Sequence, residues 1–412
     1  YFKTGTSFHH CKPLNDLNLN RRITNVKIKG KQYPAVIEVL FSLLSSVRSL
    51  EIENSNNLSQ WIEHIKKLSP CLRELLINYN NTDIKTITEY CPYLEKLSLI
   101  SEYCESKSSD ILQTIASHCP RLRSLNKYLF YHTSAECDAD LTAFAEKCPQ
   151  LEELSLDCEQ LTDQSVIALA QHCSRLKTLE LLWSHITATS LIALSERGLP
   201  LEELSVPMIP IPSAEIAAQC AHALSRICKL NTYRFGVNID TLLNAIQYLT
   251  GLRELDLNSS EDHLFVPHLL LLLQGQCCVG LESLTIGSDS IINSQQLCEL
   301  VALCPQLHTL EISNPTCTSN ALLVELARSC PHLQNVAVYS SSEVTEEGVL
   351  TLAAHCRQLR EIDIPNIACT EETVRKLAQH CRHLIQLVTS IIKQGEVRYE
   401  RYYKKKISAL RL

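Results

Sequence analysis

The stretch CPQLEELSLDCEQLTDQSVIALAQHC, from Cys148 to Cys173, contains two hydrophobic periods in succession. In its first half, apolar residues such as Leu154 and Leu156 alternate with polar ones, as a short strand requires. Apolar residues of the second half recur at helical spacing, at Val166, Leu169, Ala170 and Cys173. Thr162 stands where it can cap that helix, and Asp163 where it favours the helix's positive end. The stretch therefore predicts a short strand followed by a helix.

Variants of this motif occur along most of the chain in the form Cys-x-x-Leu-x-x-Leu-x-Leu. Clear copies begin at Cys91, Cys148, Cys173, Cys304, Cys330 and Cys356. Twelve intervals cover the 312 residues from Ser69 to Cys381, which is a mean of 26 residues, and two degenerate copies end at Ile28 and Ile52. About fifteen units result. One unit cannot bury its own apolar stripe, but stacked units share a continuous core, so the pattern predicts a solenoid.

A strand and a helix in each repeat of this length are the signature of a leucine-rich repeat. Because parallel strands lie ~4.8 Å apart and helices are wider, the stack is expected to curve. We predict an α/β fold, a right-handed horseshoe with parallel strands on its concave face and helices on its convex face. The even composition along the chain supports one continuous architecture. Since 45% of the 412 residues are hydrophobic, the chain can bury a large core and is not expected to be disordered.

The charge of the chain is unevenly placed. Residues 393–412 carry a net charge of +5. Because the whole chain carries −7, the body up to Ile392 carries −12. An acidic body disfavours nucleic acid as the main partner, because phosphate neutralisation supplies most non-specific affinity. The longest leucine run, Leu269 to Leu273, is far shorter than the ~20 apolar residues of a membrane span. We therefore expect no nucleic-acid and no membrane partner.

Twenty cysteines raise the question of disulfide bonds or a metal site. Eleven of them are assigned to one slot, where the chain leaves the helix: Cys71, Cys91, Cys119, Cys148, Cys173, Cys228, Cys278, Cys304, Cys330, Cys356 and Cys381. A small apolar side chain with a weak donor suits a buried corner, and no CxxC pair exists. We expect reduced, structural cysteines and a cytoplasmic or nuclear protein.

No catalytic signature of the GxSxG, HExxH or GxGxxG type is present. Doublets such as His118–Cys119 and His355–Cys356 resemble ligand pairs, but they recur because the repeat recurs. Each histidine is expected in a last helical turn, where a cation complements the helix dipole. We therefore expect no enzyme active site, no metal and no cofactor.

Function is expected on the concave face, in the outward strand positions and the residues directly after them. These candidate residues for binding a protein substrate are Tyr79, Asp157, Glu180, Trp183, Asp256, Asn258, Glu311, Tyr339 and Asp363. Trp183 and Tyr339 have the most weight, because exposed aromatic side chains are typical binding anchors. The alternative is that each of them packs only against a neighbouring strand.

Irregular stretches interrupt the repeat, above all the insertion from Asn258 to Leu270 and the proline cluster from Pro207 to Pro212. Each is either a bend in the horseshoe or a loop that touches a partner, and the bend is favoured. The C-terminal segment from Val397 alternates aromatic and basic residues. A terminal cap over the last unit is favoured over a ligand-binding tail.

With CPxLxxLxLxxCxxLTDxxVxxLAxxC in view, as in Cys148 to Cys173, the chain resembles the cysteine-containing repeats of the F-box/leucine-rich-repeat family over residues ~20–392. In that family the repeats are the substrate receptor of an SCF-type ubiquitin ligase, and an N-terminal F-box binds the Skp1 adaptor. The resemblance thus implies a protein substrate, ubiquitin-dependent degradation and the Skp1–cullin machinery as partners.

No F-box is visible in the sequence, and we expect one upstream of Tyr1. The expected organisation is a run-in over residues 1–20, the repeat domain over 21–392 and a basic-aromatic tail or cap over 393–412. Two alternatives remain. One is a scaffold or inhibitor without an F-box, similar to the mitotic-exit antagonist proteins. The other is a GTPase activator on related repeats, for which no candidate catalytic group stands out.

Overall fold

The computed structural model describes residues 25–29, 47–53, 59–78, 81–100, 111–128, 134–181, 184–207, 209–231, 244, 247–257, 278–287, 292–314, 317–339, 343–393, 396–404 and 407. The chain forms two compact units, Tyr1–Glu203 and Leu204–Leu412. Both units repeat the same order of a short strand followed by a helix. The insertion predicted at Asn258 to Leu270 lies outside the described residues.

The first unit contains seven described strands and six described helices. Its strands are β1 (Asn25–Lys29), β2 (Ser49–Glu53), β3 (Glu74–Asn78), β4 (Lys96–Ile100), β5 (Ser124–Tyr128), β6 (Glu153–Asp157) and β7 (Thr178–Glu180). Its helices are α2 (Ser59–Leu68), α3 (Asn81–Tyr90), α4 (Ile111–His118), α5 (Ser134–Lys147), α6 (Asp163–His172) and α7 (Ala188–Arg197).

The second unit continues the pattern from β8 (Glu203–Pro207), which starts at the unit boundary. Its further strands are β9 (Ile227–Asn231), β10 (Glu254–Leu257), β11 (Ser283–Ile286), β12 (Thr309–Ile312), β13 (Asn335–Val338), β14 (Glu361–Cys369), β15 (Gln386–Lys393) and β16 (Glu396–Tyr403). The described helices are α8 (Ala214–Gln219), α9 (Ala221–Leu224), α12 (Ser294–Ala302), α13 (Asn320–Ser329), α14 (Glu346–His355) and α15 (Glu371–His380).

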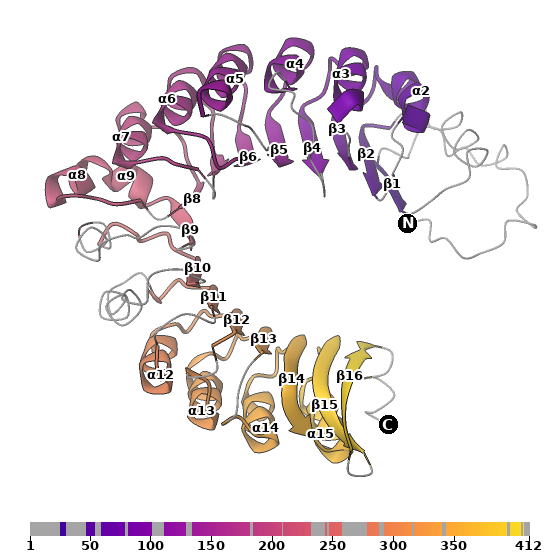
Figure 1. Cartoon of the computed structure of the whole chain (residues 1–412), viewed down its shortest axis with the longest axis vertical. Coiled ribbons are helices and arrows are strands. Elements are labelled where there is room, and N and C mark those ends of the chain that lie inside the picture. The colour runs from indigo at the N-terminus through magenta and orange to yellow at the C-terminus, as the bar shows by residue number, and fades with distance from the viewer. Residues whose placement is uncertain are drawn as a thin grey trace, which may run out of the picture. The chain divides into compact units, whose positions relative to one another are not determined.

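Within each unit, strands pair with their neighbours in chain order. The pairs are parallel and in register; Leu154 of β6, for example, lies opposite Leu125 of β5 and Leu179 of β7. Only β16, among the strands described, runs antiparallel to its neighbour, β15. In each unit the strands form one layer and the helices the other (Figure 1). These observations confirm the predicted leucine-rich-repeat solenoid.

The core lies between the two layers and is filled by the residues that the two sequence periods identify. Leu154 and Leu156 of β6 are fully or almost fully buried, while Glu153 is exposed. Val166 and Leu169 of α6 are fully buried as well. Thr162 is the N-cap residue, and its hydroxyl accepts a hydrogen bond from the backbone N–H of Gln164. The predicted strand, helix and cap are all confirmed in this repeat.

Nine of the eleven cysteines assigned to one slot occupy it and are buried: Cys91, Cys119, Cys148, Cys173, Cys278, Cys304, Cys330, Cys356 and Cys381. The assignment was wrong for two others. Cys228 lies inside β9, where the register shifts between Leu204 and Ser205 of the neighbouring strand. Cys71 follows the slot residue Ser69 by two positions and is only half-buried.

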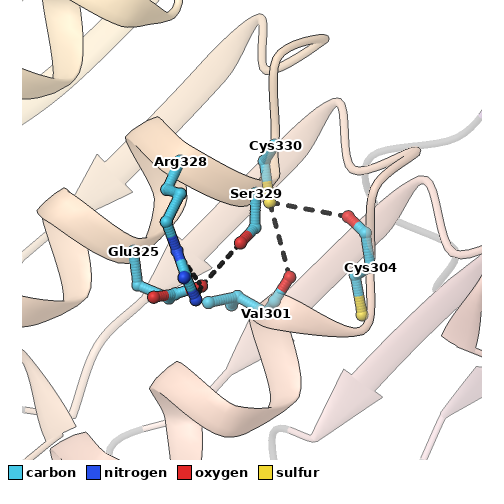
Figure 2. Close-up of polar contacts among 6 residues, drawn as sticks. All are labelled: Val301, Cys304, Glu325, Arg328, Ser329 and Cys330. Carbon is cyan, nitrogen blue, oxygen red and sulfur yellow. Dashed lines mark hydrogen bonds and ion pairs between the residues drawn. The ribbon is translucent and has the colours of Figure 1, made fainter.

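Several slot cysteines connect successive repeats through their thiols. Figure 2 shows the thiol of Cys330 within hydrogen-bond distance of two carbonyl oxygens in the preceding repeat, those of Val301 (3.6 Å) and Cys304 (3.5 Å). Cys119 and Cys173 make the same pair of contacts with the repeat before them, and Cys356 contacts the carbonyl oxygens of Cys330 and Leu326. These carbonyl oxygens also accept backbone N–H groups; that of Val301, for example, accepts from Cys304 at 3.1 Å. The thiols therefore add a second donor to backbone acceptors at a buried helix end.

A second connection joins the beginnings of successive helices. The first residue of α6, Asp163, accepts hydrogen bonds from the backbone N–H (2.8 Å) and hydroxyl (2.6 Å) of Thr187, the N-cap of α7. Glu346 of α14 accepts in the same way from the backbone N–H of Thr370, the N-cap of α15. One repeat thus positions the helix cap of the next. Together with the thiol contacts at the helix C-termini, these bonds fix the register of neighbouring repeats at both ends of the helices.

Candidate functional site

The candidate binding surface is the strand face that points away from the helices. Three of the nine predicted residues, Tyr79, Trp183 and Asn258, lie outside the described residues. The other six belong to two groups, one in each unit. The role of all nine in binding stays a prediction.

In the first unit, Asp157 ends β6 and Glu180 ends β7, both on the face opposite the buried leucines. Ser155 lies in register with Glu180 and donates its hydroxyl hydrogen to that carboxylate at 2.8 Å. Partial burial raises the pKa of Asp157, and the negative charges of Glu159 and Glu180 raise it further. The structure thus brings Asp157 and Glu180 within electrostatic reach of each other.

In the second unit, three predicted acidic residues lie in one row across the strands. Asp256 of β10, Glu311 of β12 and Asp363 of β14 share one register position on alternate strands. Thr285 and Ala337 occupy that position on the strands between them. Successive carboxylate-bearing strands are therefore about 10 Å apart. We call Asp256, Glu311 and Asp363 the acidic row.

The pKa values show that the members of the acidic row interact. Partial burial raises the pKa of Glu311, and the charges of Asp256 and Asp363 on either side raise it further. Burial also raises the pKa of Asp363. A positive group placed over the row would favour the ionised form of each carboxylate. This surface is thus suited to contact basic side chains.

Tyr339, directly after β13, lies beside the acidic row. Its backbone N–H donates to the carbonyl oxygen of Ile312 at 3.0 Å, which continues the ladder between β12 and β13. Partial burial raises the pKa of the Tyr339 phenol, and the charges of Glu311, Asp363 and Tyr399 raise it further. The Tyr339 side chain is half-buried, so part of the ring packs against the protein and part faces solvent.

The sequence prediction missed residues of β16 that lie on this surface. Arg401 is opposite Val388 of β15, which in turn is opposite Asp363, and the Arg401 charge lowers the pKa of that carboxyl. Tyr399 and Tyr403 flank Arg401 on the same face of the strand, and each is 57% exposed. The Arg401 guanidinium donates to the Tyr399 hydroxyl at 3.3 Å.

A sequence signal for this group was available. Tyr399, Arg401 and Tyr403 alternate with residues such as the buried Tyr402, which is the period of a strand. Only Gln394 and Gly395 separate this run from the preceding one, a spacing typical of hairpins. The division of the chain at residues 392 and 393 itself stays a prediction.

Three histidines of the His-Cys doublets contact their own or the neighbouring helix. Nδ1 of His355 and of His380 lies within hydrogen-bond distance of the carbonyl oxygen four residues earlier, at 2.9 and 2.7 Å. Nδ1 of His118 lies 3.0 Å from the hydroxyl of Thr88 in the preceding repeat. Within the described ranges, no three His, Cys, Asp or Glu side chains are grouped so that they could hold a metal ion.

Comparison with known proteins shows the fold but no family. No protein-family model matches the chain, and no curated protein matches it in sequence. Among solved structures, the yeast complex of Rad7 and Elc1 contains a chain that matches with a TM-score of 0.53. The alignment has 17% identity and covers 83% of this chain and 80% of that one. The shared feature is the fold.

A further match is the complex of TLR13 with ssRNA13, at a TM-score of 0.35 and 14% identity over 86% of this chain and 60% of that one. A search for membrane spans finds no described helix of sufficient length and apolar character to cross a bilayer.

Proposed function

We propose that this chain is the substrate-recognition subunit of an SCF-type ubiquitin ligase and binds a protein substrate on its exposed strand face. The ligase assignment rests on the resemblance of the cysteine-containing repeats to the F-box/leucine-rich-repeat family. The chain itself acts as a non-catalytic adaptor: its strand face binds the substrate, and partner enzymes carry out the ubiquitination. We place it in the cytoplasm or nucleus, in line with its buried thiols.

The observation that carries the proposal is the composition of the strand face in the second unit. Tyr339, Tyr399, Tyr403 and Arg401 lie beside the acidic row. Tyrosine and arginine are enriched among the residues that dominate the energy of protein interfaces. The exposed tyrosines offer apolar contact area, and the acidic row offers partners for basic groups of the substrate.

In the proposed complex, the Skp1–cullin machinery binds an F-box upstream of the repeats. Rad7, a protein of the same fold, was crystallised together with Elc1. We take that complex as an example of a repeat solenoid that associates with a second protein. Our assignment to Skp1 rests on the family resemblance.

Affinity purification of the natural protein from its own cells tests both the binding of Skp1 and cullin and the binding of a substrate. We expect Skp1 and a cullin to copurify, together with a protein that accumulates when the gene is deleted. The double variant Tyr399→Ala/Tyr403→Ala should lose that substrate and keep Skp1. The matched control is Tyr93→Ala, since Tyr93 is also exposed (40%) but lies on the turn between α3 and β4, between Arg73 and Arg121.

Two outcomes would count against the proposal in different ways. Purification without Skp1 and cullin, but with a stable partner that does not accumulate on deletion, would support the scaffold or inhibitor instead. Retention of the substrate by the Tyr399/Tyr403 double variant would leave the ligase role standing and remove the binding surface assigned to it.

A further inference from the structure

Two cysteines outside the repeated slot face each other in the first unit. The sulfur atoms of Cys137 and Cys158 are 3.5 Å apart. Cys137 lies near the beginning of α5, and Cys158 directly follows Asp157 at the end of β6. Both side chains are buried, with exposures of 0% and 1%. These two residues therefore join neighbouring repeats through their side chains.

This pair differs from the slot cysteines in what its sulfur atoms contact. The slot thiol of Cys119 lies 3.4 Å from a backbone carbonyl oxygen, and that of Cys330 lies 3.5 Å from another. Burial raises the pKa of both slot thiols to about 12, so they stay protonated at neutral pH. Cys137 and Cys158 instead have each other as close neighbours.

We propose that Cys137 and Cys158 are an oxidation site, at which a peroxide converts the two thiols into a disulfide between adjacent repeats. The inference goes beyond the proposed function and does not depend on it. A disulfide bond is about 2.05 Å long, so the sulfur atoms must approach by roughly 1.5 Å, which small side-chain rotations can supply.

The surrounding hydrogen bonds hold the two segments together. Asp138, next to Cys137, accepts hydrogen bonds from the Thr162 backbone N–H (3.0 Å) and hydroxyl (2.6 Å). It also accepts from the Ser165 hydroxyl at 2.5 Å. The start of α5, which carries Cys137, is thus fixed before any reaction to the segment that follows Cys158. Such orientation raises the effective concentration of one thiol beside the other.

Cys158 is the member suited to react first. Its pKa is lowered by the neighbouring Cys137 thiol and by the backbone N–H groups of Gln160 and Leu161, although burial opposes them. The thiolate is the reactive form of cysteine. A local opening at the start of α5 would admit a small oxidant, since helix ends open at a lower free energy than helix centres.

The reaction balances with hydrogen peroxide as the oxidant. The Cys158 thiolate attacks one peroxide oxygen, the O–O bond breaks, and hydroxide leaves, so that Cys158 becomes a sulfenic acid. The Cys137 sulfur then attacks the Cys158 sulfur, and the S–O bond breaks. The thiol proton and the hydroxyl group leave as water. Two thiols and one peroxide thus yield one disulfide and two water molecules.

Peptide mapping of the folded, purified chain tests this directly. The protein is treated with graded hydrogen peroxide, its remaining thiols are alkylated in denaturant, and the digest is analysed by mass spectrometry. We expect a cross-linked peptide pair that contains Cys137 and Cys158 and lacks two hydrogen atoms, at peroxide concentrations that leave Cys119 and Cys330 alkylated. The oxidised protein should also unfold at a higher urea concentration.

Two variants sharpen the test. Cys137→Ser should stop at a sulfenic acid on Cys158 that a dimedone probe captures, whereas the matched slot variant Cys304→Ser should still form the disulfide. If a variant does not fold, the peptide map of the wild-type protein still decides the test. The proposal is overturned if the wild type yields no Cys137–Cys158 pair. It is also overturned if that pair forms no faster than in the denatured chain.

Discussion

The thiol of Cys330 lies 3.5 Å from the backbone carbonyl oxygen of Cys304, the residue at the same position one repeat earlier (Figure 2). This relationship explains why cysteine recurs at the end of so many helices. The side chain is small enough for a fully buried corner, and its thiol adds a donor to carbonyl oxygens of the preceding repeat that also accept a backbone N–H. Alanine would fit the corner but offers no donor.

We therefore expect Cys330→Ala to lower the free energy of unfolding by about 1 to 2 kcal/mol, because the two contacts that the thiol adds to carbonyl oxygens of the preceding repeat are lost and a small cavity opens. Urea denaturation followed by circular dichroism measures the change. Cys71→Ala is the control, since Cys71 is half-buried and lies outside the slot. An equal loss in both variants would show that the position in the slot has no special role.

The buried thiols also predict how stability depends on pH. Burial raises the pKa of Cys91, Cys119, Cys148, Cys173 and Cys330 from the ordinary 9.0 to about 12. In the unfolded chain these thiols ionise near pH 9, while in the folded chain they stay protonated. Their contribution to stability is thus fully present below pH 9 and is lost as the pH rises toward 12.

Urea denaturation at a series of pH values from 7 to about 11 checks this expectation, in a reducing buffer. Each shifted thiol contributes a slope of up to about 1.4 kcal/mol per pH unit in that window. The double variant Cys173→Ala/Cys330→Ala should show a shallower decline than the wild type, although it starts from a lower stability. Parallel curves would contradict the assignment to the thiols.

Asp163 connects the beginnings of α6 and α7, because its carboxylate accepts three hydrogen bonds from Thr187 and Ser190. Asp163→Ala removes these acceptors and leaves the N-cap of α7 unsupported. We expect a loss of about 2 to 3 kcal/mol in the free energy of unfolding. Gln164→Ala, at the exposed next position, should change it by less than about 0.5 kcal/mol.

Gly348 is the third residue of α14, and a side chain there would collide with Asn320 of α13. An added Cβ would lie only 2.9 Å from Asn320 Cγ. Asn320 is itself held in place by Thr345. Its side-chain oxygen accepts a hydrogen bond from the Thr345 backbone N–H, and its amide nitrogen donates one to the Thr345 hydroxyl, both at 3.0 Å. Although alanine favours a helix by about 1 kcal/mol over glycine, we expect Gly348→Ala to cost about 1 to 3 kcal/mol.

A double-mutant cycle by urea denaturation tests this explanation. In an Asn320→Ala background the collision with Asn320 is absent and a 3.2 Å contact with Leu323 Cδ1 remains, so Gly348→Ala should destabilise the protein less there. If Gly348→Ala destabilises both backgrounds equally, contact with Asn320 is not the cause.

The sequence was sufficient for the architecture because the decisive signals are local. Alternation around Leu154 and helical spacing around Leu169 define one strand and one helix, and repetition extends them along the chain. The slot was assigned wrongly for Cys228 because the shifted register between β8 and β9 has no counterpart in the repeat pattern. For the candidate binding surface, the outward strand positions could be predicted, but not which of them lie together.

Local pattern determined by itself that this chain is a leucine-rich-repeat solenoid with buried cysteines, since strand and helix periods arise from residues a few positions apart. Only the tertiary structure decided which side chains from different repeats meet. Asp363 and Arg401 interact because β15 and β16 pair antiparallel in one particular register. Cys137 and Cys158 face each other because of how two repeats pack. Such contacts depend on the register and on rotamers selected by packing.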